Sequence, residues 1–116
     1  MISGQFKIEL AGQERTMVAN FAFIEMVELQ VVRKPISQLV SEAVSGSFSV
    51  SDLVDVITCG LKANRDTRLT RSEIGEEIVK RGMVNFVKTY IEILTFAITG
   101  ETEPKLTEAR EEDVKK

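Results

Sequence analysis

The sequence predicts a mainly α-helical fold, in which a short N-terminal β-hairpin packs on a bundle of about five short helices. Apolar residues recur at intervals of three and four over most of the chain, and helix-capping residues precede those stretches. Apolar and polar residues alternate near the start, as in a strand. The chain has 116 residues, 43% of them hydrophobic, which is enough for one domain with its own core. We therefore expect a single helical domain over residues 1–100.

The predicted hairpin comes first. Its opening strand is indicated by apolar residues that alternate with charged ones, at Phe6, Ile8 and Leu10. Residues 11–14 predict a turn, in which Gly12 can adopt a positive φ, and residues 15–19 predict the return strand. Because an isolated hairpin is only marginally stable in water, we expect this one to pack against the helices.

The first two helices are separated by a proline. Asn20 is a good cap for a helix that runs to about Val32, and apolar residues cover so much of its circumference that we expect the central, most enclosed helix here. Pro35 stops this helix and can serve as the first residue of the next one, which Gly46 can end in a left-handed conformation. The apolar face of the second helix is predicted to comprise Ile36, Leu39, Val40, Ala43 and Val44.

Capping residues fix the start of the next two helices. Ser49 can cap a helix that runs to about Ala63. Thr70 and Glu73 can exchange side-chain to backbone hydrogen bonds in a capping box, which opens a helix that runs to Gly82. The inward-facing residues of this fourth helix are expected to be Ile74, Ile78 and Val79.

The last helix is predicted from about Met83 to Thr99, and it carries more apolar surface than a one-sided helix needs. One stripe is formed by Met83, Phe86, Tyr90, Leu94 and Ala97. A neighbouring stripe is formed by Val84, Val87, Ile91 and Ile98. Burial in the centre of the bundle would account for both stripes. The second stripe is also the candidate surface for binding a partner, either a second copy or an apolar segment of another chain.

Residues 101–116 have a different composition from the rest of the chain. They include six acidic and four basic residues, and their only sizeable aliphatic residues are Leu106 and Val114. Such a segment buries too little apolar surface to offset the entropy lost on ordering. We expect a charged, disordered tail.

Catalysis receives no support from the residue types present. The chain has no histidine, so its single cysteine, Cys59, lacks the usual activating base, and we interpret it as a structural, partly buried thiol. Residues 62–73 superficially resemble a calcium-binding EF-hand loop, but Lys62 stands at the first position, where an acidic ligand is needed. We expect a protein that is not an enzyme and binds no metal or cofactor.

Nucleic acid and membranes are not expected partners either. The net charge is −3, so long-range attraction to phosphates is unsupported. Arg65, Arg68 and Arg71 could suggest a helix-turn-helix, but glutamates occupy the turns that would face the bases. No apolar run approaches the roughly 20 residues that span a bilayer, and the N-terminus lacks the features of a signal peptide. We therefore expect the protein in the cytoplasm.

In order, these segments resemble a family of small proteins from phages and gene-transfer agents, which are usually grouped as tail assembly chaperones and sometimes described as tail tube proteins. The resemblance covers about residues 3–100 and consists of ordered segments, with no catalytic signature. The segments are the G-x-F-x-I-x-L-x-G run at residues 4–12, residues 20–28, Lys34-Pro35-Ile36, residues 52–57 and 60–63, Leu69-Thr70, residues 76–82, and the long apolar helix.

The resemblance implies a non-enzymatic role in building a phage tail in the cytoplasm of a bacterial host. Chaperones of this family are thought to coat the long tape-measure protein and keep it soluble until tube subunits assemble around it. The expected partners are the tape-measure protein or other tail proteins, with self-association into a homo-oligomer left open. The alternatives are a structural tail component, such as a tube or completion protein, and a small DNA-binding regulator. The source, whether an active phage, a prophage remnant or a gene-transfer agent, is also left open.

Overall fold

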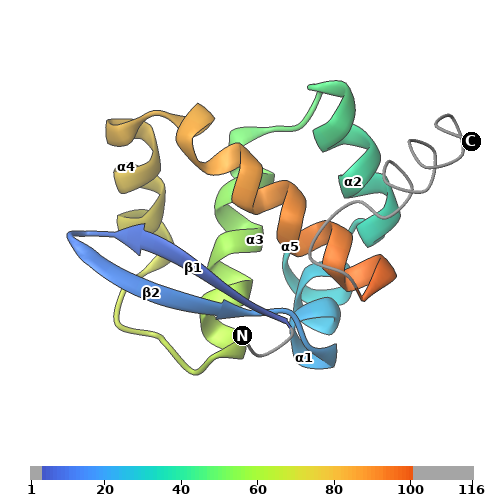
Figure 1. The fold of residues 1–116 in the computed structure, drawn as a ribbon, viewed down its shortest axis with the longest axis horizontal. Coiled ribbons are helices and arrows are strands. Elements are labelled where there is room, and N and C mark those ends of the chain that lie inside the picture. The colour runs from blue at the N-terminus through green and yellow to red at the C-terminus, as the bar shows by residue number, and fades with distance from the viewer. Residues whose placement is uncertain (1–3, 101–116) are drawn as a thin grey trace, which may run out of the picture.

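The computed structural model describes residues 4–100, in which a hairpin precedes a series of helices (Figure 1). The elements are β1 Gln5–Leu10, β2 Gln13–Val18, α1 Phe21–Glu25, η1 Met26–Val31, α2 Ile36–Ser45, α3 Val50–Ala63, α4 Arg71–Arg81, η2 Met83–Phe86 and α5 Val87–Thr99. Of these, η1 is a π-helix and η2 is a 3-10 helix. The predicted fold, mainly α with a short N-terminal hairpin, is confirmed. The predicted tail, residues 101–116, lies outside the described residues.

The hairpin is tighter than predicted. Strands β1 and β2 pair antiparallel with Leu10 opposite Gln13, so the connecting turn contains only Ala11 and Gly12. Both turn residues have positive φ, 55° and 78°, as in the type I′ turns that match the twist of a two-residue hairpin. The return strand therefore begins at Gln13, two residues before the predicted start at Arg15.

The first helix departs from its prediction in two ways. It begins at the predicted cap, where Asn20 Oδ1 accepts a hydrogen bond of 2.9 Å from the Phe23 amide, but it continues as a π-helix after Glu25. It is also not the most enclosed helix, because Phe21 is 70% exposed and Leu29 is 68% exposed. The backbone bonds of a π-helix run from i to i+5, so the α-helical spacing used to assign a buried face does not apply to Leu29 in η1.

The central helix is α3, in which nine consecutive residues, Leu53–Leu61, are buried. It contacts β2, α1, η1, α4 and α5, and the hairpin crosses it (Figure 1). The hairpin lies very close to α3 at Gly60, where an added Cβ would be only 2.9 Å from Met17 Cβ of β2. The absence of a side chain at Gly60 therefore lets the hairpin lie directly on α3.

The predicted helix caps are confirmed. Thr70 Oγ1 accepts a 3.1 Å bond from the Glu73 amide, and Glu73 Oε1 accepts a 2.8 Å bond from the Thr70 amide. Ser49 Oγ accepts a 3.0 Å bond from the Asp52 amide, and Gly46 ends α2 with a φ of 81°. These local hydrogen bonds set the entry and exit directions of the helices.

Two details at α2 and α4 correct the prediction. Pro35 is the cap of α2 and not its first residue, and Glu28 of η1 accepts a 2.8 Å bond from the Ile36 amide. Val44 and Val79, both expected to face inward, are 70% and 68% exposed. The core covers only one side of each short helix, so side chains at the margin of the predicted apolar face remain in solvent.

Candidate partner-binding surfaces

The last helix divides its two apolar stripes between the core and the surface. In the first stripe Phe86, Tyr90 and Leu94 are buried. In the second, Val84 of η2 is 77% exposed and Ile98 of α5 is 50% exposed. Between them, the half-buried side chains of Val87 and Ile91 pack against the core. We call Val84, Val87, Ile91 and Ile98 the α5 face.

Neighbouring aromatic contacts hold α5 in this orientation. The Tyr90 ring lies 5.5 Å from the Phe48 ring between centroids, and Phe96 packs edge-on against Phe6 of β1 at 5.7 Å. Ile93, which belongs to neither predicted stripe, is fully buried. Helix α5 also contacts β1 and α2. These contacts cover more of the helix than its sequence pattern alone indicates.

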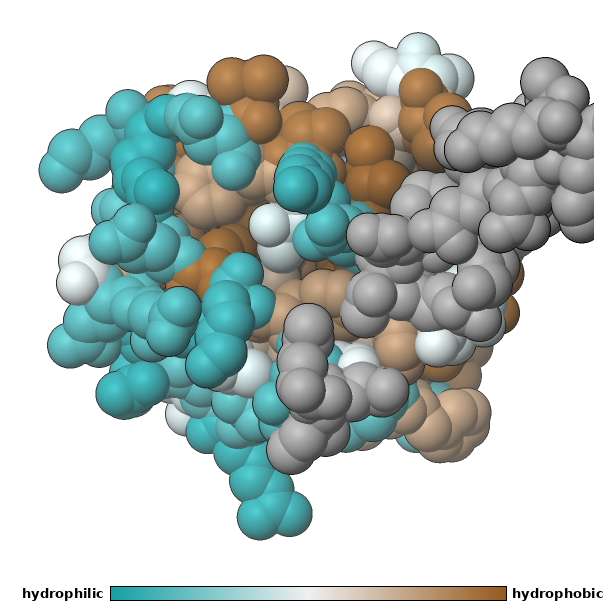
Figure 2. All heavy atoms as spheres, in the orientation of Figure 1, coloured by the Kyte–Doolittle hydropathy of each residue, from teal (hydrophilic) through white to brown (hydrophobic). Residues whose placement is uncertain are grey.

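A neighbouring helix also exposes an apolar side chain. Helix α2 packs against α5, and its Val44 is 70% exposed. Figure 2 shows brown, apolar side chains gathered on the side where η2, α5 and α2 lie in Figure 1, whereas the side over α4 and the hairpin is mostly teal. Exposed apolar side chains that gather together can form an interaction site. Phe21, Leu29 and Val79 are exposed on other helices, so the α5 face is one of several candidate regions.

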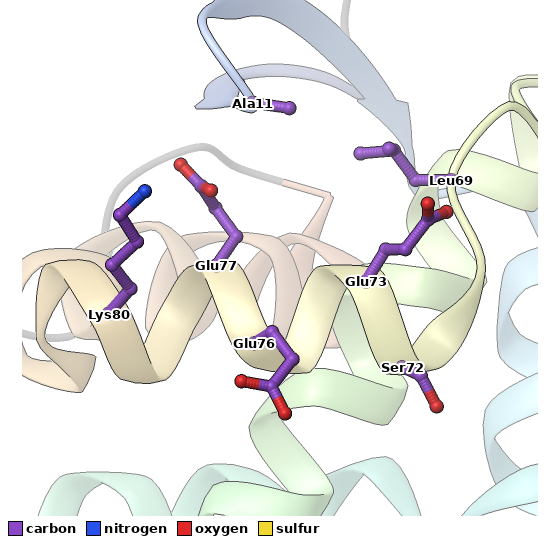
Figure 3. A pocket seen from close by; sticks show the side chains of 7 residues that line it. All are labelled: Ala11, Leu69, Ser72, Glu73, Glu76, Glu77 and Lys80. Carbon is purple, nitrogen blue, oxygen red and sulfur yellow. The ribbon is translucent and has the colours of Figure 1, made fainter.

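A groove of different character lies between the hairpin turn and α4 (Figure 3). Its volume is about 610 Å³. It is lined by Ala11 of the turn, Leu69 before α4, and five residues of α4, namely Ser72, Glu73, Glu76, Glu77 and Lys80. The groove therefore combines two apolar side chains with a predominantly acidic helix face.

The basic loop that suggested DNA binding is largely neutralised within the protein. The guanidinium of Arg68 bonds Asp66 at 3.0 Å. Arg71 pairs with the carboxylate of Asp55 and donates a 3.0 Å bond to Ser51 Oγ. Because these cations already have anionic partners, the loop offers fewer free charges to a phosphate backbone than its sequence indicates.

Cys59 is enclosed by the core and is only 1% exposed, which confirms that it is a buried thiol. Burial raises the pKa of this thiol to about 11. The reactive thiolate is therefore about 0.1% populated at pH 8.

We expect native protein at pH 8 to react with iodoacetamide at least about 100-fold more slowly than protein unfolded in guanidinium chloride. Mass spectrometry of quenched samples measures both rates, and equal rates would contradict this prediction.

Among residues 4–100 there is no group of three or more histidine, cysteine, aspartate or glutamate side chains that could hold a metal ion. None of the helices described there combines the length and the apolar character needed to cross a membrane.

The fold defines a small, mainly helical protein that leaves apolar side chains exposed on several of its helices. A family model described as phage tail tube protein, GTA-gp10, matches residues 3–100. The chain therefore belongs to this family of phage tail proteins, and the predicted relation to phage tails is confirmed. Searches of curated proteins and of solved structures gave no match.

Proposed function

We propose that the protein is a non-enzymatic phage tail assembly chaperone, which binds the tape-measure protein in the bacterial cytoplasm while the tail is built. The observation that carries this proposal is the α5 face, which leaves Val84 and Ile98 in solvent in a member of a phage tail family. A long helical chain with exposed apolar stripes is liable to aggregate before it is enclosed. A small protein with an accessible apolar face can cover such a stripe reversibly.

The arrangement of the α5 face suits an apolar helix as partner. Val84, Val87 and Ile91 follow one another at intervals of three and four residues, so they lie along one side of the chain. Helices that dock on a partner use the same spacing for their apolar anchors. Because Val87 and Ile91 are half-buried against the core, they need little rearrangement to form the middle of the contact.

A second candidate function is a permanent structural component of the tail, such as a tube or completion protein. The family description, which names the tail tube, favours it. The fold favours the chaperone, because the only sheet in residues 4–100 is the two-stranded hairpin, whereas a continuous tube wall needs extended sheets. Mass spectrometry of purified particles separates the two functions. Absence from the particle supports the chaperone, and stoichiometric presence supports the structural component.

The chaperone proposal predicts that the α5 face is required for tape-measure solubility. Co-expression with the tape-measure protein from the same tail gene cluster is expected to raise its soluble yield and to yield a co-purifying complex. The double variant Val84→Asp/Ile98→Asp places two charges on exposed positions of the α5 face. Because burying unpaired carboxylates is costly, we expect at least about a 10-fold loss of co-purified tape-measure protein.

The matched control is Val79→Asp, which introduces the same charge at another highly exposed valine, on α4 outside the α5 face. Circular dichroism and thermal unfolding establish that all variants fold. An equal loss of binding with Val79→Asp would show a general effect of charge. No co-purification with the unmodified protein would refute the chaperone function.

A further inference from the structure

We propose that two copies of the protein pair through the α5 face, with their α5 helices antiparallel across a twofold axis near Ile91. The resulting homodimer keeps the α5 face covered before a tape-measure protein is present. This inference rests on the proposed function in that both use the same face. The pairing itself follows from the spacing of the apolar side chains and from two charges beside them.

The apolar side chains of the α5 face recur every seven residues. Val84 precedes Ile91 by seven positions, and Ile98 follows it by seven. Such a spacing keeps apolar side chains along one seam between two packed helices. Because Ile91 lies midway, a twofold axis through it sets Val84 of one copy opposite Ile98 of the second copy. The α5 face is therefore complementary to itself in the antiparallel orientation.

The α5 face is open to a second copy. Val84 and Ile98, at its two ends, are 77% and 50% exposed, and Ile91 between them is half-buried. In Figure 1, α5 runs along the outside of the bundle, and no other described element lies over it in this view. A helix of a second copy can therefore approach along the length of α5.

Two charges without internal partners flank the apolar side chains. Lys88 is exposed and Glu92 is half-buried. Within residues 4–100, neither forms an ion pair or a side-chain hydrogen bond, although they stand four residues apart on one helix. At 3.6 residues per turn, Lys88 lies about 60° and Glu92 about 100° round the helix from Ile91, in the same direction. Both charges are therefore available on the same margin of the face.

The antiparallel orientation brings these opposite charges together twice. With the axis at Ile91, Lys88 of one copy and Glu92 of the second copy are offset by two residues, about 3 Å along the helix. The two Lys88 side chains are offset by six residues, about 9 Å, and the two Glu92 side chains lie further round and point away from each other. A parallel pair would instead set Lys88 beside Lys88. The charges thus favour a second copy in the antiparallel orientation.

Sedimentation equilibrium of the purified full chain, from about 10 µM to 1 mM, tests the pairing. We expect a reversible dimer with a dissociation constant on the order of 100 µM, because few side chains meet. Val84→Asp should weaken the dimer by at least about 10-fold, since it buries an unpaired carboxylate. The matched control, Val79→Asp on α4, should change it by less than about twofold. A monomer at every concentration would overturn the inference.

Charge reversal tests the orientation. Lys88→Glu and Glu92→Lys should each weaken the dimer by about 10-fold, because each sets like charges together at two places. An equimolar mixture of these two variants should pair as tightly as the unmodified protein, since opposite charges then meet again at both places. The double variant Lys88→Glu/Glu92→Lys should also pair normally. A mixture that pairs no better than either variant alone would overturn the antiparallel arrangement.

The outcomes for this inference and for the proposed function are distinguishable. The dimer is measured on the protein alone, and tape-measure binding is measured separately by co-purification. A dimer that pairs as expected, combined with no co-purification, would refute only the chaperone function. A monomer that still co-purifies with the tape-measure protein would refute only the homodimer.

Discussion

Replacing Gly60 with valine is expected to reduce the free energy of unfolding by about 3 kcal/mol, and replacing it with alanine by about 1–2 kcal/mol. An added Cβ would lie 2.9 Å from Met17 Cβ and 3.1 Å from Met17 Sδ. The Met17 Cβ is fixed to the backbone of β2, so relief requires the hairpin to move away from α3. Alanine recovers part of the cost because it favours the helix by about 1 kcal/mol relative to glycine. Urea unfolding followed by circular dichroism measures the change.

Gly75 provides the matched control for this substitution. It also lies in a helix, but a Cβ added there would meet its nearest neighbour, Val54 Cγ1, at an ordinary contact distance of 3.7 Å. Gly75→Ala should therefore raise the free energy of unfolding by roughly 0.5–1 kcal/mol. If both alanine variants were stabilised equally, the close packing of the hairpin on α3 would be disproved.

Replacing Asp66 with alanine is expected to reduce the free energy of unfolding by about 3 kcal/mol. The guanidinium of Arg15 lies 3.5 Å from the Asp66 carboxylate, and the two side chains are only 6% and 8% exposed. Arg15 Nε also donates a 3.2 Å bond to the Leu10 carbonyl oxygen, but its Nη1 has no hydrogen bond in the described structure. Removal of Asp66 leaves a buried cation without its counter-ion, and this desolvated charge accounts for the loss.

The double variant Arg15→Met/Asp66→Ala tests this explanation. It removes both charges, so it should be more stable than Asp66→Ala alone, and a double-mutant cycle in urea measures the coupling. Additive effects of the two single changes would show that the pair is not coupled.

Hydrogen bonds from Arg68 contribute most to lowering the pKa of Asp66 to about 2, below its ordinary value of 3.8. The stabilisation is therefore complete above about pH 4 and is lost as the pH falls toward 2, a loss that Asp66→Ala should lack.

The helix starts could be predicted because a cap is decided by a few adjacent residues. Thr70 and Glu73 bond each other three positions apart, and Ser49 bonds an amide three residues on. The inner strand face was predictable for the same reason, since Phe6, Ile8 and Leu10 alternate. The buried ion pair was not, because Arg15 and Asp66 are 51 positions apart and neither residue type indicates its partner.

The misassigned burial of the first helix has a similar origin. Its many apolar residues predicted a central helix, but enclosure depends on how many neighbours surround a segment, and the chain places α3 in that position. The carboxylate of Glu28 reaches the start of α2 from η1, a contact that joins two helices and has no local signature. In the candidate site, the sequence pattern of the last helix identified apolar stripes, but only the packing of α5 determines that Val84 and Ile98 remain accessible while Val87 and Ile91 are half-buried.

The enclosure of Cys59 has a practical consequence. Since the sole sulfhydryl of the chain is 1% exposed, a second cysteine introduced at a solvent-facing position such as Val84 would be the one site open to a maleimide dye. Fluorescent or spin probes can thus be attached to the α5 face or beside the acidic groove without first engineering a cysteine-free background. The protein is suited, as it stands, to distance measurements that follow each surface separately as tail components are added.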